Sequence, residues 1–384
     1  MTYSVYQHWD PLRVCIVGKS YSPEFYSFIK NTRVRTVMER IARETEEDYQ
    51  KLITLLQSFG VEVLRPNVTD NYKDYLSRNN KIYPPPMTPR DWSTMVGNRF
   101  YYNWNDGLQV YNDIKADHWP NIKSLSEFQT IEEYQKQEVY EAIRSDSYLN
   151  YYDYEKIIHQ IQGQGNTVIS NPIRNASGII NGAQITRIGK DLYIGTAYDQ
   201  NVSNAVEISK GVAQLFTDYR CHIVNTQGHS DGTFCPVVPG LIVSLVDIPT
   251  YKDTFPDWEV IYLPGQSWHK VKEFLTLKKK NKGKWWVPGE ELNDEFTDFV
   301  ESWLGHWVGY VEETVFDVNM LVIDEKNVVC NNYNKEVFAA FERFGITPHI
   351  VNFRHRYFWD GGLHCITSDI HREGTMKDYF PNRG

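Results

Sequence analysis

The chain carries a cysteine in a turn that would bring its thiol close to a ligand. Cys365 closes the hexapeptide DGGLHC at 360–365. Adjacent glycines let a backbone turn tightly and approach a bound molecule. A thiolate in such a turn is a nucleophile, although a free cysteine is more often a small buried hydrophobic residue. Cys365 is therefore a candidate nucleophile whose role depends on its neighbours.

Two further polar clusters stand earlier in the chain. GHSDGT at 228–233 combines a histidine and an aspartate between glycines, and TPRDW at 88–92 places Arg90 beside Asp91. An imidazole in a turn can act as a general acid and base near neutral pH. The alternatives are a turn in which Asp231 bonds its own backbone while His229 is exposed, and a proline turn with a surface ion pair. None of the three clusters is specific by itself.

The elements that must position these clusters follow one pattern: an amphipathic helix, a break, then a short strand. Residues 38–59 place apolar side chains on one helical face, stop at Gly60 and lead into a strand at 61–64. Weaker copies predict strands at 168–169, 221–224 and 346–351, and the strand at 260–263 lacks a long helix. Strand-turn-strand patterns occupy 13–17, 92–100, 186–194, 233–245 and 319–329. Together they predict a fivefold repeat, with an ordinary α/β sheet as the alternative.

Two stretches interrupt this repeat and are predicted to be insertions. One lies near 101–153 and is rich in Tyr, Asn and Asp, and the other lies near 268–307 and holds five lysines within 278–284. A phosphate could bind the lysines, but a solvated loop is the better interpretation. No flexible linker divides the chain, so we predict a single domain over 1–384.

Size and composition indicate a globular protein. The 384 residues are 41% hydrophobic, enough for a large core, and the net charge of −9 argues against a general nucleic-acid or anionic-membrane binder. Five cysteines without CxxC spacing are typical of reduced cytosolic thiols. The N-terminus has no apolar signal region, and no apolar run approaches the ~20 residues of a membrane span. We expect a cytoplasmic protein with small-molecule or protein partners.

In their order along the chain, the clusters resemble motifs of the glycine and inosamine-phosphate amidinotransferases, members of the pentein superfamily. The stretch around His229 and the closing stretch around Cys365 are the most specific, and the likeness covers most of the chain. It implies a five-bladed, pseudo-fivefold α/β propeller, which agrees with the five predicted modules. The matching stretches are HWDPL at 8–12, PRD at 89–91, RIGKD at 187–191, HSD at 229–231, GGLHC at 361–365 and SDIHR at 368–372.

The resemblance also implies a reaction. Cys365, as thiolate, attacks the central carbon of a guanidinium, while His229 protonates the departing amine and later takes a proton from the incoming one. Asp91 and Asp231 stand where the family holds the planar cation through paired N–H bonds, and that cation would favour the thiolate. The expected activity is transfer of an amidino group from a guanidine donor, arginine by resemblance, to an amine acceptor through an amidino-cysteine. Neither a metal nor an organic cofactor is expected.

Three departures from the family pattern bear on the site. Asn181 stands where the family has an aspartate that orients and charges the histidine, and an amide can orient an imidazole but not neutralise an imidazolium. Ile248 stands where arginine-using members grip the substrate carboxylate with an arginine. Glu312 and Glu313 replace a serine pair, which favours a cationic amine acceptor, with a solvated acidic pair as the alternative.

Two other functions fit the same residues. A guanidine-modifying hydrolase of this fold would share every residue named, and only its product, a urea-type molecule or released ammonia, would distinguish it. A catalytically silent binding or assembly module is the second alternative, and Asn181 is its best support. Arg90, Arg187 or Arg354 are candidates to hold a substrate carboxylate in another way. The sequence leaves the acceptor amine and the oligomeric state open, with a homodimer among the options.

Overall fold

The strands of this protein are grouped into small sheets of one repeated design. The computed structural model describes residues 2–68, 82, 84–102, 152–170, 180–196, 202–226, 228–245, 251–263, 287–290, 292–304 and 318–383. Within these ranges there are five three-stranded sheets and one two-stranded sheet. In each three-stranded sheet the middle strand is antiparallel to one neighbour and parallel to the other.

Each module joins an antiparallel strand pair to a helix and a returning parallel strand. The first consists of β17 (Thr367–Arg372), β1 (Leu12–Val17), α1 (Thr32–Ser58) and β2 (Glu62–Leu64). The second and third consist of β4 (Ser93–Val96), β5 (Arg99–Tyr102), α7 (Glu155–Gly163) and β7 (Thr167–Ser170), then β8 (Ile185–Ile188), β9 (Asp191–Gly195), α8 (Val202–Ala213) and β10 (Arg220–Val224). The fourth and fifth consist of β11 (Phe234–Val238), β12 (Leu241–Ser244), α9 (Tyr251–Thr254) and β13 (Glu259–Tyr262), then β14 (Leu321–Asp324), β15 (Asn327–Cys330), α13 (Lys335–Phe344) and β16 (Thr347–Ile350).

Short elements connect the modules or lie beside them. They are η1 (Pro23–Phe28), β3 (Asn67–Val68), α3 (Pro89–Trp92), β6 (Tyr152–Asp153), η3 (Gly182–Gln184), η4 (Ser230–Gly232), α12 (Asp294–Phe299), the π-helix η6 (Val300–Leu304) and α14 (Arg356–Trp359). β3 and β6 form the two-stranded sheet.

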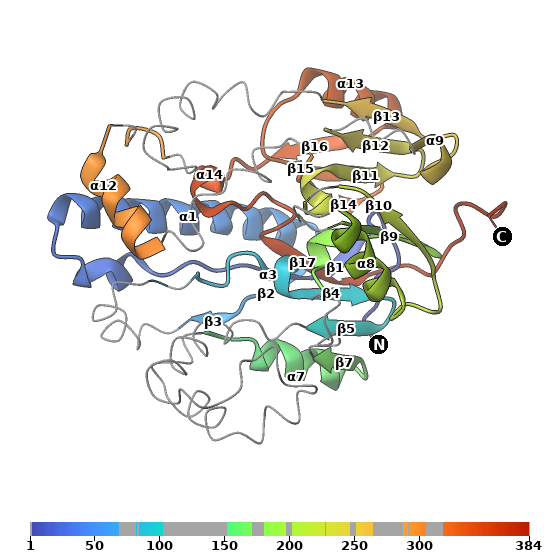
Figure 1. Ribbon diagram of the computed structural model, residues 1–384, viewed down its shortest axis with the longest axis horizontal. Helices are drawn as coiled ribbons and strands as arrows, with labels where there is room; N and C mark the ends of the chain where they lie inside the picture. The colour runs from blue at the N-terminus through green and yellow to red at the C-terminus, as the bar shows by residue number, and fades with distance from the viewer. Residues whose placement is uncertain are drawn as a thin grey trace.

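The two ends of the chain meet in one sheet. β17 pairs antiparallel with β1, from Leu12 opposite Arg372 to Val17 opposite Thr367. Figure 1 shows the red C-terminal strand beside the blue N-terminal one, with the other four modules around them. β17 covers the side of β1 that β2 leaves unpaired, and this contact completes the first module from residues at least 350 positions apart. The fold is the predicted pseudo-fivefold α/β propeller, and the alternative of one ordinary sheet is excluded.

The first helix is longer than its sequence pattern predicts. It begins at Thr32, six residues before the predicted start, because the Asn31 side chain accepts hydrogen bonds from the backbone N–H groups of Arg33 and Val34. It ends before Gly60, which has a φ of +75°. Its buried face, with Met38, Ile41 and Leu52 among its members, packs into the largest hydrophobic cluster together with strands β1 and β17. This packing holds the strand that follows Cys365.

The five returning strands were predicted at the places where β2, β7, β10, β13 and β16 lie, and these predictions are confirmed.

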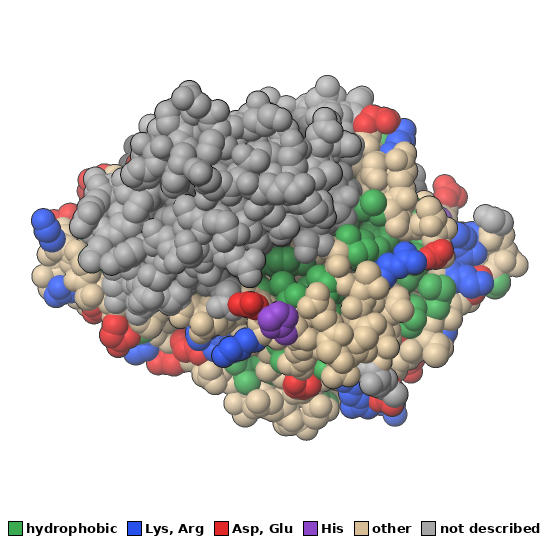
Figure 2. Space-filling view, turned by 90° about the horizontal axis from the view of Figure 1, so that it is seen from below, with side chains coloured by type: hydrophobic (Ala, Val, Ile, Leu, Met, Phe, Trp, Pro, Cys, Tyr) green, Lys and Arg blue, Asp and Glu red, His purple; other side chains and the backbone are tan. Residues whose placement is uncertain are grey.

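Other sequence predictions fall partly or wholly outside the described residues. Most of the insertions near 101–153 and 268–307 lies outside, so the single domain over 1–384 stays a prediction. No helix in the described ranges is long and apolar enough to cross a membrane. On the described part of the face in Figure 2, acidic and basic side chains are interspersed rather than gathered by sign.

Candidate active site

Five polar residues come together because each one precedes the first strand of its module. Asp91 stands two residues before β4, Asn319 two before β14 and Cys365 two before β17. Asp231 and Asn181 stand three residues before β11 and four before β8. Related modules in a ring present equivalent positions to one centre, and α3 contacts η3, which in turn contacts η4. Repetition of one supersecondary unit therefore builds the site.

The thiol of Cys365 is enclosed by two polar side chains. The residue is only 2% exposed, and its Sγ lies 3.4 Å from Asp231 Oδ2 and 3.0 Å from Asn319 Nδ2. In this arrangement the S–H donates to the Asp231 carboxylate and the sulfur accepts from the Asn319 amide. Asp231 therefore favours the thiol until a cation is bound beside it, because a thiolate would face the carboxylate.

Asp231 is held in turn by a histidine from the cysteine turn. His364 Nδ1 lies 2.7 Å from Asp231 Oδ2. Burial, together with the nearby Arg90 guanidinium, lowers the pKa of His364 well below its ordinary value, so the imidazole is neutral. Because an ionised carboxylate only accepts, the single ring proton of His364 is on Nδ1. Asp231 Oδ2 thus accepts hydrogen bonds from both the His364 ring and the Cys365 thiol.

His229 is oriented by an amide. Asn181 Oδ1 accepts from the backbone N–H of Ala183 at 2.8 Å, so its Nδ2 faces His229 Nε2, also at 2.8 Å. Since Nδ2 can only donate, Nε2 accepts, and the proton of the neutral ring is on Nδ1. That atom lies 3.7 Å from Asp91 Oδ1, and both side chains are 23% exposed. A second proton on this ring would require the Asn181 amide to turn over and give up Ala183.

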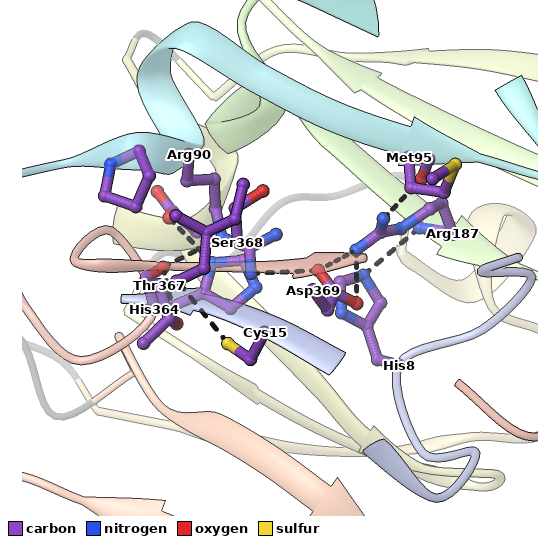
Figure 3. A network of polar contacts seen from close by, with 12 residues as sticks. His8, Cys15, Arg90, Met95, Arg187, His364, Thr367, Ser368 and Asp369 are labelled. Carbon is purple, nitrogen blue, oxygen red and sulfur yellow. Dashed lines mark hydrogen bonds and ion pairs between the residues drawn. The ribbon is translucent and has the colours of Figure 1, made fainter. Parts of the chain in front are cut away.

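Beneath the site, three arginines surround one aspartate. Asp369 Oδ1 lies 3.0 Å from Arg90 and 2.7 Å from Arg187, and Asp369 Oδ2 lies 2.7 Å from Arg372. Figure 3 shows Asp369 with Arg187 on one side and Arg90 and His364 on the other. Burial raises the pKa of Asp369, but the guanidinium groups of Arg187, Arg90 and Arg372 outweigh it and hold the pKa well below its ordinary range.

All three arginines predicted as candidates for binding a carboxylate make contacts within the protein, two of them in this network. Arg90 is fully buried and its Nε donates to the His364 carbonyl at 2.8 Å, so it fixes the cysteine turn from below. Arg187 is 1% exposed and donates to Asp369 and to the Met95 carbonyl. Arg354 donates to Asp48 and Glu47 along α1. A buried guanidinium must stay paired, so these contacts do not favour the substrate role predicted for Arg90.

Some predicted residues cannot be placed, and two were missed. Ile248, Glu312 and Glu313 lie outside the described residues. Asn319 and Asp369 were not predicted as part of the site, although the position of Asn319 two residues before a strand repeats that of Asp91 and Cys365. Within the described ranges, no cluster of three His, Cys, Asp or Glu side chains is arranged to hold a metal ion.

Comparisons with known proteins place this site in a wider group. No protein-family model matches the chain. The chain is 24% identical over 403 residues to the mitochondrial glycine amidinotransferase of Xenopus tropicalis, covering 98% of this chain and 84% of that one. It is 25% identical over 203 residues to the L-arginine:L-lysine amidinotransferase of Pseudomonas savastanoi pv. phaseolicola, over 52% of this chain and 46% of that one. This chain is similar in sequence to amidinotransferases.

The fold of the chain is also similar to that of a solved amidinotransferase. A solved amidinotransferase of the saxitoxin biosynthetic pathway from Microseira wollei superposes with a TM-score of 0.62 at 16% identity, covering 99% of this chain and 100% of that one. The likeness extends over the whole propeller and includes every module that contributes a site residue. The resemblance predicted from the motifs is confirmed.

Proposed function

We propose that this chain transfers an amidino group from a guanidine donor to an amine acceptor through a covalent intermediate on Cys365. The observation that carries the proposal is the contact of the Cys365 thiol with the Asp231 carboxylate, at 3.4 Å. The second carboxylate, Asp91, lies in the same site, with its Oδ1 3.7 Å from Nδ1 of the oriented His229. Two carboxylates suit a planar guanidinium cation, since each carboxylate can accept a pair of hydrogen bonds from its N–H groups. The homology to amidinotransferases supports the same reaction.

In the first half of the reaction the donor is cleaved. The guanidinium binds between Asp91 and Asp231, and its positive charge offsets the repulsion between the Asp231 carboxylate and a Cys365 thiolate. The thiolate forms a bond to the guanidinium carbon, and the bond from that carbon to the donor amine breaks. His229, which takes up the proton that Cys365 loses on forming the thiolate, gives a proton to the leaving amine. A cationic amidino-thioether is left on Cys365.

In the second half the acceptor takes the amidino group. The acceptor nitrogen attacks the same carbon, neutral His229 removes its proton, and the carbon–sulfur bond breaks to return the Cys365 thiolate. The product is a new guanidinium, and the enzyme regains its starting charge. Water must be excluded while the thioether exists, because hydrolysis would consume it.

The donor and the acceptor are proposed with different support. The Pseudomonas relative is named for arginine as donor, and we propose arginine here as well. The relatives are named for glycine and for lysine as acceptors, so homology does not choose between them. A cationic acceptor, favoured by Glu312 and Glu313, stays a prediction from the sequence. The cytoplasmic location and a homodimer also stay predictions.

The test is capture of the intermediate. After incubation with arginine and an acid quench, intact-protein mass spectrometry is expected to show one added amidino group on the wild-type chain, on the peptide that contains Cys365. Cys365→Ala is expected to show none while circular dichroism confirms that it folds. A panel of other guanidines extends the test to other donors.

The outcomes separate the three functions. An adduct that is released only when an amine is added supports amidino transfer. An adduct lost in water, with a urea-type product or ammonia, indicates a hydrolase of the same fold. Folded wild-type protein that forms no adduct with any guanidine would contradict both, and would leave the binding module that Asn181 favours.

A further inference from the structure

We propose that Asn319 is a catalytic residue that stabilises the thiolate of Cys365 through its side-chain N–H, in addition to holding the turn that carries the cysteine. The inference rests on the proposed nucleophilic role of Cys365. Asn319 is the contribution of the fifth module to the site, and it touches the reacting sulfur directly at 3.0 Å.

The Asn319 carboxamide has only one orientation that fits its surroundings. Its Oδ1 accepts from the backbone N–H of His364 at 2.8 Å and from that of Cys365 at 3.2 Å. Both of those groups are donors, so the carbonyl oxygen must face them and the amide nitrogen must face the other way. Nδ2 then donates to Cys365 Sγ at 3.0 Å and to the Asp231 carbonyl at 3.3 Å.

The position of Asn319 is enforced by packing. The residue is fully buried, and a Cβ on Gly362 would lie 2.5 Å from its Oδ1 and 2.7 Å from its Cγ. The absence of a side chain at Gly362 is therefore what allows the carboxamide to reach under the cysteine turn. A group that is bonded at four points and cannot move aside is pre-organised for the charge that develops beside it.

The chemistry follows from what the two neighbours of the sulfur can do. A carboxylate at Asp231 accepts from the thiol but repels a thiolate, whereas the Asn319 N–H binds a thiolate more strongly than a thiol. Cys365 thus carries one contact that favours the protonated form and one that favours the ionised form. Without Asn319, the thiolate would lose this N–H contact.

The test titrates Cys365 in the absence of any guanidine. The ultraviolet absorbance of the thiolate is measured against pH for the wild-type chain, and the curve of Cys365→Ala is subtracted to remove the other four cysteines. The same difference is taken for Asn319→Asp and for Asn319→Ala, where the curve that is subtracted is that of the double variant carrying Cys365→Ala as well. Asn319→Asp keeps the oxygen that accepts from the two backbone N–H groups but has no amide N–H. Asn331→Ala is the control, since Asn331 Nδ2 donates to the backbone carbonyl of Asn319, at 3.5 Å, and not to its side chain.

We expect the Cys365 titration midpoint to move upward by about one pH unit or more in both Asn319 variants, which is a loss of thiolate of roughly tenfold at a given pH. Asn331→Ala is expected to leave the midpoint in place. An unchanged midpoint in either folded Asn319 variant would overturn the proposal. So would loss of folding in both of them beside a folded Asn331→Ala, because Asn319 would then serve the fold alone.

This result is independent of the proposed transfer reaction. If the midpoint moves as expected but arginine leaves no adduct on Cys365, the thiolate contact stands and amidino transfer fails. If an adduct forms while the midpoint is the same in every variant, amidino transfer stands and the role of Asn319 fails.

Discussion

At the scale of single residues, the hydrogen-bond direction at His229 decides what the ring can do. Asn181 donates to Nε2 because its oxygen is taken by the Ala183 N–H. A general acid needs a second proton on the ring. The Asn181 amide must then turn over, which places its NH₂ group against the N–H of Ala183, so that two donors face each other. A carboxylate would satisfy Ala183 with one oxygen and Nε2–H with the other.

Restoring that carboxylate is expected to accelerate the reaction. We predict that Asn181→Asp raises the rate of adduct formation roughly tenfold, because it removes a hydrogen-bond loss of about 1–3 kcal/mol from the protonated state of His229. Asn181→Ala is expected to be slower than the wild-type chain, since the ring loses its orientation. Adduct rates measured over a range of pH check the prediction, and an Asn181→Asp variant no faster than wild type at any pH would contradict it.

At the scale of elements, the cysteine turn depends on contacts from other modules. Arg90, within α3, donates to the His364 carbonyl, and Asn319, two residues before β14, accepts from the backbone N–H groups of His364 and Cys365. These contacts add to the turn's own hydrogen bonds, such as that from the Ile366 N–H to the Gly362 carbonyl at 3.0 Å, and the turn also depends on what packs against its glycines.

The two adjacent glycines of this turn offer a matched comparison. A Cβ on Gly362 would lie 2.5 Å from Asn319 Oδ1, whereas a Cβ on Gly361 would lie 3.2 Å from the methyl groups of Ile366 and Thr88. We expect Gly362→Ala to lower the free energy of unfolding by about 1–3 kcal/mol and to reduce adduct formation at least tenfold, with much smaller effects for Gly361→Ala. Urea unfolding and the adduct assay measure both, and equal effects of the two variants would refute the packing argument.

At the scale of the whole molecule, the centre of the propeller holds a buried ionic network. Three arginines share Asp369, and two neutral histidines lie beside them. Burial and the Arg187 charge lower the pKa of His8 well below its ordinary value, as burial and Arg90 do for His364. These groups link the stability of the fold to pH.

The sign of that linkage gives a prediction. Below about pH 6.5 the unfolded chain binds protons at His8 and His364 that the folded chain does not, so the free energy of unfolding falls as the pH falls. The slope is up to about 1.4 kcal/mol per pH unit for each histidine, and the lowered pKa values of His355 and His371 add to it. Asp369 acts only at lower pH, because its contribution is lost as the pH falls below about 3.8 through its depressed folded pKa.

Denaturant unfolding at a series of pH values between about 7.5 and 5.5 measures this slope. His8→Gln keeps an acceptor for the Arg187 backbone N–H, which lies 3.2 Å from His8 Nε2, but cannot titrate. We expect the dependence of the free energy of unfolding on pH to be weaker in this variant by the contribution of about one bound proton, up to about 1.4 kcal/mol per pH unit. Stability that does not change with pH in the wild-type chain would contradict the neutral state of these histidines.

Local patterns in the sequence predicted much of this protein. Helical periodicity located α1, and the strand patterns located the five returning strands, because burial of one face of an element produces a periodic pattern of apolar residues along the sequence. The glycine-flanked clusters likewise pointed to Cys365, His229, Asp231 and Asp91, whose chemistry depends on residue type and close neighbours. These features are local, and a single sequence records them.

What only the tertiary structure decided depends on residues far apart in the chain. The pairing of β17 with β1 joins the two ends, and no local pattern specifies which strand fills an open edge. Arg90 has a charged side chain typical of a substrate site, yet its guanidinium is buried against Asp369, 279 positions further along. Asn319 has no motif around it, and only the ring of modules brings its amide to the Cys365 sulfur. The sequence therefore predicted the modules and the candidate nucleophile Cys365, while the contacts around its thiol came from closure of the propeller.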